Sequence, residues 1–310
     1  MTREKLTIIM YHYVRPIKES NFPRIKGLEV KSFKTQLDYL SKYYSFITAE
    51  QLINYSLYND ILPSNPCYLT FDDGYKDHIN YVMPELLSRG IQGSFFPSVD
   101  AVIKRKILDI NAIHFILAST DDYRKLVLEL IKECFEHGLT ESQINILKFT
   151  WGLPGRYDNG DIMFFKNLLQ HALPKNIRKS IISKMFKIYV GVDETIFSDG
   201  LYVSLSDVKK LIDNGMYVGC HGAQHIHLGK ESKSDQNLDI GLSLQFLKRI
   251  GTSIKNWIMC YPSGSYNADT LDILKSNNCL IGLTTKVGYA DLDRSKMLEL
   301  NRFDTNDFHQ

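Results

Sequence analysis

Short apolar segments alternate along the chain with segments whose apolar residues recur every three or four positions. The apolar segments at 6–11, 67–71 and 92–96 are typical of strands buried in a parallel sheet. Helical spacing between them predicts helices, one capped by Ser32 and one by Thr48, where Gln51 completes a capping box. This alternation predicts an α/β fold with a mainly parallel sheet.

The same alternation returns after about residue 200. Ser206 is a candidate N-cap for a helix that ends near Gly215. The rest of this region is predicted to contain helices 237–250 and 268–276 and strands 217–219, 257–261, 280–284 and 298–303. Together with the N-terminal strands, these elements match a small barrel or an open sheet.

The middle of the chain has a different pattern. From about residue 104 to 191 the strand signal disappears and helical spacing predominates, for example over 123–134 and 162–169. We therefore interpret 104–191 as a helical insertion in one loop of an α/β body, which is formed by 1–103 and 192–310.

Composition and charge narrow the class of protein. The 310 residues carry 37 Lys and Arg against 35 Asp and Glu, and this net charge of +2 gives no reason to expect a nucleic-acid partner. No apolar run approaches the ~18–20 residues of a transmembrane helix, and the first residues have no signal-peptide cleavage site. The five cysteines are scattered and odd in number, as is typical of a reducing compartment. These features predict a cytoplasmic protein.

Two polar motifs each follow a predicted strand. Asp72 and Asp73 precede a glycine after one strand, and His221 and His225 come after another. Active sites of α/β proteins form at the carboxyl ends of the strands, and two histidines four apart face one side of a helical turn. One aspartate and two histidines would leave positions open for water, as in a hydrolytic metal centre. Taken alone, the Asp-Asp-Gly sequence is an ordinary turn that caps the next helix.

A third motif, Pro262-Ser263-Gly264, follows the predicted strand 257–261. Its tight turn could direct the backbone N–H of Ser263 at a developing oxyanion. Without the other two motifs, this sequence predicts only a turn.

The three motifs together resemble those of the NodB-type polysaccharide deacetylases, carbohydrate esterase family four. The segment 70–75 resembles the family motif with two aspartates, 221–225 resembles the His-Ser/Thr-x-x-His motif, and 260–264 partly matches the Arg-x-Pro-Tyr-Gly motif. The resemblance covers about 1–103 and 200–305. It implies a distorted (β/α) barrel and a divalent metal, most often zinc.

The resemblance also implies a role for each matching residue. Asp73, His221 and His225 would bind the metal, Asp72 would be the general base, and the N–H of Ser263 would stabilise the oxyanion.

This chain departs from the family pattern at two places. Cys260 stands where the family has the arginine that orients the base, and Ser263 stands where it has a tyrosine. Leu300-Asn301-Arg302 replaces the usual Leu-x-His, which carries the general acid. Arg302 is a candidate for the missing arginine, since its charge would keep the base ionised. His12 and His227 are candidates for the acid; the alternative for His12 is a hydrogen-bonded barrel residue, and His227 is more typical of a surface residue.

The predicted activity is removal of an N-acetyl group from an amino sugar, a nucleotide- or lipid-linked intermediate of surface-polysaccharide biosynthesis. The alternatives are an O-acetyl or N-formyl hydrolase on the same scaffold and a non-catalytic carbohydrate-binding relic. The insertion is predicted to cap the metal cleft or to form a homo-oligomer contact, with Trp151, Arg156 and Tyr157 as candidates to hold a sugar and a phosphate. A remote decoration that only stabilises the body is the alternative.

Overall fold

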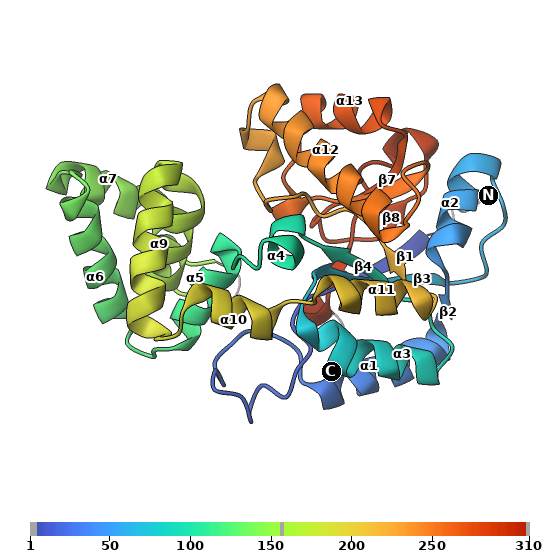
Figure 1. The fold of residues 1–310 in the computed structure, drawn as a ribbon, viewed down its shortest axis with the longest axis horizontal. Coiled ribbons are helices and arrows are strands. Elements are labelled where there is room, and N and C mark those ends of the chain that lie inside the picture. Colours follow the sequence, from blue (N-terminus) through green and yellow to red (C-terminus); the bar gives the residue numbers. More distant parts are fainter. Residues whose placement is uncertain (1–4, 156–157, 308–310) are drawn as a thin grey trace. The chain divides into compact units, whose positions relative to one another are not determined.

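The computed structural model describes residues 5–155 and 158–307, which form two compact units (Figure 1). Unit 1 consists of the described residues within Met1–Arg15, Gly27–Lys106 and Ser198–Gln310. Unit 2 consists of those within Pro16–Lys26 and Ile107–Phe197, so it includes an N-terminal segment besides the central part of the chain. The predicted domain boundaries near 104 and 191 stay a prediction.

Unit 1 contains the nine strands that the described residues form. The strands are β1 (Lys5–Tyr11), β2 (Ser45–Phe46), β3 (Pro66–Asp73), β4 (Ser94–Pro97), β5 (Tyr217–Val218), β6 (Trp257–Cys260), β7 (Cys279–Leu283), β8 (Ala290–Asp291) and β9 (Phe303–Asp304). The α-helices are α1 (Val30–Tyr43), α2 (Ala49–Tyr58), α3 (Met83–Ser88), α4 (Val99–Ile103), α11 (Leu205–Asp213), α12 (Lys233–Ile250) and α13 (Ala268–Ser276). Short π or 3₁₀ segments are η1 (His78–Val82), η3 (Leu228–Lys230), η4 (Pro262–Gly264), η5 (Arg294–Lys296) and η6 (Thr305–Asp307).

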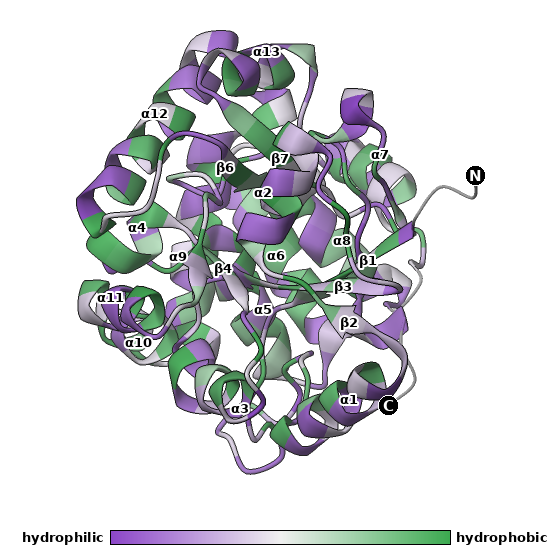
Figure 2. Ribbon diagram, turned by 90° about the vertical axis from the view of Figure 1, so that its right-hand side faces the viewer, coloured by the Kyte–Doolittle hydropathy of each residue, from purple (hydrophilic) through white to green (hydrophobic). Residues whose placement is uncertain are grey.

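The main sheet is largely parallel and has β3 at its centre. Its strand order is β5-β4-β3-β1-β8, with β2 also paired to β3 and β9 paired to β1, and only the β1–β8 pairing is antiparallel. A separate parallel pair is formed by β6 and β7. Helices α1, α3 and α11 cover one face of the sheet, and α12 and α13 lie beyond the other (Figures 1 and 2). The predicted α/β fold with a parallel sheet is therefore confirmed.

Residues of β1 and β3 alternate between two buried clusters. Ile9 and Leu69 belong to a cluster that also contains residues of the helices, such as Phe33. Ile8 and Tyr68 belong to a second cluster, which also contains Ile258 and Cys260 of β6 and Ile281 and Leu283 of β7. All eight residues of β3 are buried, as expected for a strand with both faces covered. Because of this alternation, the even-numbered residues of β3 lie on the same face of the sheet as Asp72.

Several predicted helix starts can be compared with the structure. The capping box between Thr48 and Gln51 is present at the start of α2. Helix α1 starts at Val30 instead of after Ser32, and α11 is capped by Ser204 instead of Ser206. The reason at α11 is reciprocal hydrogen bonding, because the Ser204 hydroxyl accepts from the Asp207 N–H and the Asp207 carboxylate accepts from the Ser204 N–H. The predicted strand 298–303 is reduced to β9 and an isolated bridge at Leu300.

The described residues of unit 2 form helices and loops and no strand. It contains α5 (Asp109–Ala118), α6 (Tyr123–Glu136), α7 (Glu141–Trp151), α8 (Gly160–Asn167), η2 (Leu168–Ala172) and α9 (Lys175–Tyr189), and α10 (Glu194–Leu201) crosses from unit 2 into unit 1. Its interior is aromatic, since Phe197 makes edge contacts with Phe22, Phe115 and Phe186 at centroid distances of 4.7–5.7 Å. Among all the described helices, none combines the length and the apolar character needed to cross a bilayer.

Candidate active site

The turn at the end of β3 brings two adjacent carboxylates into one buried region. On a regular strand Asp72 and Asp73 would point to opposite faces. Asp73 instead has φ = 70° and Gly74 has φ = 77°, so the backbone leaves the extended conformation of the strand at this point. A Cβ atom at Gly74 would lie 2.6 Å from the Cβ of Pro97, which excludes any larger residue without movement of β4. The turn therefore requires glycine for both conformation and space.

Asp73 faces the two histidines of the second motif. The distance from Asp73 Oδ1 is 3.2 Å to His221 Nε2 and 3.3 Å to His225 Nε2. All three side chains are nearly buried, and the two imidazole centroids are 4.8 Å apart. Three potential ligand atoms from two strand ends therefore converge.

The histidines converge by a loop and not by the helical turn that we expected. Residues 221–227 are not helical, and both Gly222 and His225 have left-handed backbone conformations, with φ = 69° and 54°. Asp239 of α12 holds this loop, because its buried carboxylate accepts from the N–H groups of Ala223 and Gln224 at 2.9 Å each. Burial raises the pKa of Asp239, and these two hydrogen bonds oppose the increase. These two hydrogen bonds to Asp239, and not a turn of helix, hold the loop that carries both histidines.

Hydrogen bonds orient both ligand-like side chains. The Nδ1 of His221 lies 2.8 Å from the backbone carbonyl of Cys260, which can only accept, so Nδ1 carries the proton. Its Nε2 then directs a lone pair at Asp73 Oδ1 unless a second proton or a cation lies between them. The other oxygen of Asp73 accepts from the Tyr75 hydroxyl. Hydrogen bonds from the histidines outweigh the effect of burial and hold the pKa of Asp73 well below its usual range.

The distances fit a divalent cation. Zinc binds histidine nitrogen and carboxylate oxygen at roughly 2.0–2.2 Å, which places ligand atoms of one ion about 3–3.5 Å apart. The two distances of 3.2 and 3.3 Å to Asp73 Oδ1 agree with this spacing. The donor set of two imidazoles and one carboxylate is suited to zinc and leaves positions open for water and a substrate.

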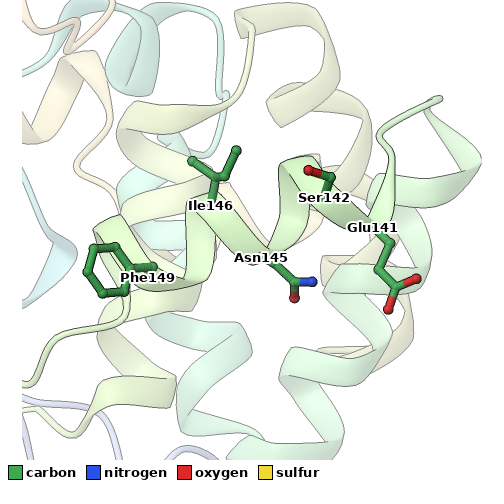
Figure 3. A pocket seen from close by; sticks show the side chains of 5 residues that line it. All are labelled: Glu141, Ser142, Asn145, Ile146 and Phe149. Atoms are coloured by element: carbon green, nitrogen blue, oxygen red, sulfur yellow. The ribbon is translucent and has the colours of Figure 1, made fainter.

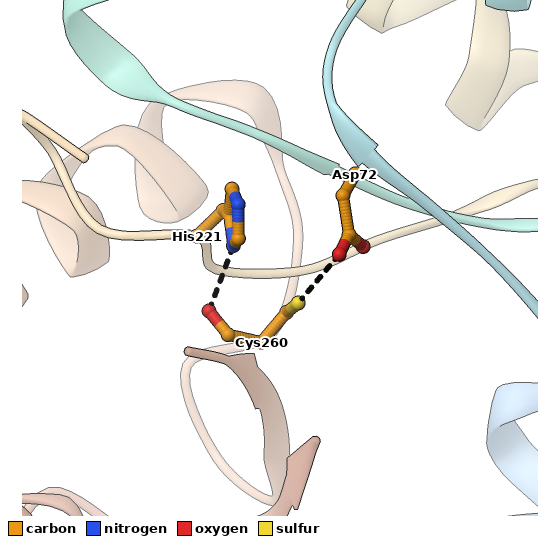
Figure 4. A group of neighbouring side chains, drawn as sticks. All are labelled: Asp72, His221 and Cys260. Carbon is orange, nitrogen blue, oxygen red and sulfur yellow. Dashed lines mark hydrogen bonds between the residues drawn. The ribbon is translucent and has the colours of Figure 1, made fainter. Parts of the chain in front are cut away.

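Asp72 has a different set of neighbours. The guanidinium of Arg302 donates to both of its oxygens, with Nη1–Oδ1 at 3.0 Å and Nη2–Oδ2 at 2.8 Å, and both side chains are buried. The thiol of Cys260 donates to Asp72 Oδ2 with Sγ–Oδ2 at 3.3 Å (Figure 4). Burial raises the pKa of Asp72, but the charges of Arg302, His221 and His12 together lower it to about 2. Arg302 therefore lies where the resemblance leads one to expect an arginine, although it comes from another strand end.

A second group of ligand atoms, from Asp72, His221 and Cys260, is also close enough to be considered for a cation. Asp72 already bears the bidentate contact of Arg302, so a cation placed there would meet a buried positive charge. His221 also directs its protonated Nδ1 to the Cys260 carbonyl in this group. The electrostatics therefore favour the first group, Asp73 with both histidines.

The other candidate residues are His12, Ser263 and His227. His12 Nε2 is 4.0 Å from Asp72 Oδ2, and its side chain is 38% exposed, so solvent reaches it. Ser263 has φ = 53° within the short turn η4. In this turn the N–H groups of Gly264 and Ser265 donate to the carbonyls of Tyr261 and Pro262. His227 is the N-cap residue of η3.

Of the residues predicted to bind a substrate in the insertion, Arg156 and Tyr157 lie outside the described residues. Trp151 ends α7 in unit 2, where its ring lies 6.1 Å from that of His171.

Sequence reasoning missed Tyr75 and Asp239. Asp239 falls on the buried face of α12, in register with Ile240 and Ser243. A charged residue at an apolar position of a predicted helix is a signal that could have identified it. No comparable signal marks Tyr75, because an aromatic residue after a strand is common in cores.

The comparisons with known proteins agree with this fold. Residues 183–280 match the family model described as polysaccharide deacetylase. The deacetylase PplD from Streptococcus pyogenes has a TM-score of 0.57 at 19% identity, covering 98% of this chain and 93% of that one. IcaB from Ammonifex degensii has a TM-score of 0.58 at 16% identity, with 97% and 92% covered, and the de-N-acetylase from Aggregatibacter actinomycetemcomitans has 0.55 at 15%, with 97% and 94% covered. By sequence, no curated protein matches.

The matched domain and the fold support a hydrolytic carbohydrate deacetylase. The family match over residues 183–280 and the fold shared with solved polysaccharide deacetylases support the NodB-type polysaccharide deacetylases, carbohydrate esterase family four. The activity at this level is the hydrolytic removal of an acyl group from a carbohydrate.

The buried pair of Arg302 and Asp72 generates a prediction about stability. Arg302→Met leaves the Asp72 charge buried without a partner and should lower the free energy of unfolding by about 3–5 kcal/mol. Adding Asp72→Asn should restore a large part of the loss, because the unpaired charge disappears. Urea unfolding of the single and double variants measures this coupling.

The matched control is Arg89→Met, which removes another arginine–aspartate contact. Arg89 is 24% exposed and pairs with Asp38, which is 59% exposed, and with Glu85 one helical turn away, so solvent screens these contacts and the loss should be about 0–1 kcal/mol. Equal losses for the two arginine variants, or no recovery in the double variant, would contradict the assignment of a buried, coupled pair.

Proposed function

We propose that this protein is a metal-dependent N-deacetylase acting on an amino sugar. The observation that carries the proposal is the convergence of Asp73 Oδ1 with the Nε2 atoms of His221 and His225, directly beside the separately held carboxylate of Asp72. A site that only bound sugar would not need three buried, convergent ligand atoms next to a buried ionised carboxylate.

Asp73, His221 and His225 would hold the ion, which we propose to be zinc because two imidazoles and one carboxylate are among its common donor sets. A divalent ion in such a site polarises a carbonyl group and lowers the pKa of water. The Cys260 carbonyl accepts a hydrogen bond from His221, and the Tyr75 hydroxyl donates one to Asp73. Such hydrogen bonds to the ligands are common in metal sites.

The remaining residues would handle protons and the developing charge. Asp72 would accept a proton from the attacking water, and Arg302 would keep it ionised before that step. The N–H of Ser263 would donate to the tetrahedral oxyanion. His12 is the proposed acid that protonates the departing amine, because it is partly exposed and lies 4.0 Å from Asp72. The amide C–N bond then breaks, and acetate and a free amino sugar leave.

The proposed substrate is a nucleotide- or lipid-linked amino sugar of surface-polysaccharide biosynthesis, handled in the cytoplasm. All five cysteines are buried and unpaired, which suits a reducing compartment. PplD was solved in complex with acetate, which supports acetyl as the group removed.

Product analysis tests the proposal directly. Purified protein with added zinc would be incubated with a nucleotide-linked N-acetylhexosamine and with a polyprenyl-linked one, and acetate and free amine would be quantified. Equal amounts of both products support an N-deacetylase. O-acetylated and N-formylated sugars would be incubated in parallel. Acetate from the O-acetylated sugar alone identifies an O-acetyl hydrolase, formate from the N-formylated sugar alone identifies an N-formyl hydrolase, and binding without any product identifies a carbohydrate-binding relic.

The ligand assignment predicts the metal content. The protein should bind about one divalent ion per chain, and His221→Ala should lose most of it because one of three ligands is removed. Elemental analysis after dialysis measures the content, and His137→Ala, at an exposed helix end in unit 2, is the control. Unchanged metal in His221→Ala would place the ion elsewhere.

The division of roles between the aspartates predicts a kinetic difference. Asp72→Asn should keep the metal and lower kcat by roughly 10²–10⁴-fold, because an amide cannot accept the proton. Asp73→Asn should lose metal affinity as well as activity. Metal content and acetate release measured on the same preparations separate the two, and the reverse pattern would exchange their roles.

We also propose that unit 2 mediates self-association. Ile146 and Phe149 lie three residues apart on one face of α7 and are 63% and 87% exposed, next to Ser142 and Asn145 (Figure 3). Phe149→Glu should therefore convert an oligomer to a smaller species in analytical ultracentrifugation, whereas Leu238→Glu, at an exposed apolar position of α12, should not. A wild-type protein that is monomeric at all concentrations would contradict the proposal.

A further inference from the structure

We propose that Cys260 is a positioning residue that aligns the carboxylate of Asp72 with the imidazole of His221. The inference rests on the function proposed above and concerns a residue for which the resemblance predicts no role, since Cys260 only marks the position of a missing arginine. Two independent contacts made by this one residue carry it.

Cys260 is the last residue of β6 and is fully buried. Its side chain and its backbone point at different members of the site (Figure 4). The thiol donates to Asp72 Oδ2, and the backbone carbonyl accepts from His221 Nδ1 at 2.8 Å. The proposed base and one proposed ligand are thus both hydrogen-bonded to a single residue of the separate β6–β7 pair.

The thiol contact decides which acceptor position of Asp72 remains available. A carboxylate has about four lone-pair positions. The guanidinium of Arg302 uses one on each oxygen, and the thiol of Cys260 uses the second one on Oδ2. The remaining position is on Oδ1, so that oxygen would receive the proton from water.

The size of the side chain at position 260 is also constrained. Cys260 and Arg302 are both fully buried and both contact Asp72. A long side chain at 260 would compete with the guanidinium for the same space and for the same oxygen. A cysteine is small enough to leave Arg302 in place and still supplies a donor. Burial also raises the pKa of the Cys260 thiol, so it keeps the proton that it donates.

The two contacts of Cys260 respond differently to substitution. Cys260→Ala removes the thiol donor but keeps the carbonyl that orients His221. We therefore expect kcat for acetate release to fall about tenfold, while KM and the zinc content stay within twofold of the wild type. Cys260→Ser keeps a donor, and we expect it to recover most of kcat. This rescue and the separation of kcat from metal content would not result from a merely structural role.

Cys279→Ala is the matched control. Cys279 is a buried cysteine of the neighbouring strand β7, and its thiol contacts the backbone carbonyls of Trp257 and Ile281 instead of the site. This variant should have wild-type kcat even if its thermal midpoint falls as much as that of Cys260→Ala. A reduced kcat in both alanine variants would indicate a general packing effect and overturn the inference.

The remaining outcomes are distinguishable from failure of the proposed function. Wild-type kcat in Cys260→Ala, together with an inactive Asp72→Asn, would overturn the positioning role alone. Loss of zinc in Cys260→Ala would show that the thiol acts on the ligands and would also overturn it. A zinc-loaded wild-type protein that releases no acetate would overturn the proposed function and the inference with it.

Discussion

The buried pair of Arg302 and Asp72 is the interaction on which the site depends. A carboxylate buried near the end of the central strand β3 loses its hydration, and only a well-placed cation offsets the free-energy cost of that loss. The cation comes from 230 residues later in the chain. The Nε of Arg302 donates to the carbonyl of Thr284, and its backbone N–H donates to that of Lys286, so both ends of the residue are fixed. The charge of Asp72 therefore depends on the docking of the C-terminal segment, where β9 pairs with β1.

Many of the strands and helices could be predicted, because they depend on the local pattern of apolar and polar residues. Buried strands such as β3 are apolar segments, and the capping box at Thr48 is recognisable from four residues. The resemblance also implied which aspartate would lie beside the histidines, and Asp73 does. The position of Arg302 could be anticipated only from the resemblance, since no local pattern relates residues so far apart.

The remaining features depend on backbone conformations and tertiary contacts. The spacing of His221 and His225 suggested a helical turn, but the glycine between them adopts a left-handed conformation, and Asp239 from another helix supplies acceptors for the loop. Similarly, the alternation of a strand would separate Asp72 from Asp73. Only the left-handed conformation of Asp73 turns it toward the histidines, and a periodic pattern contains no information about it.

The different roles proposed for the two aspartates follow from what surrounds each carboxylate. Asp72 is in bidentate contact with a guanidinium, so its negative charge is already compensated and an additional cation would be repelled. Asp73 is contacted by a phenol and two imidazoles, and imidazoles bind a divalent ion together with a carboxylate. Neighbouring carboxylates with the same chemistry are thus made unequal by one arginine. The placement of that arginine, and not the order of the two residues in the sequence, favours Asp73 as the proposed ligand and keeps Asp72 ionised as the proposed base.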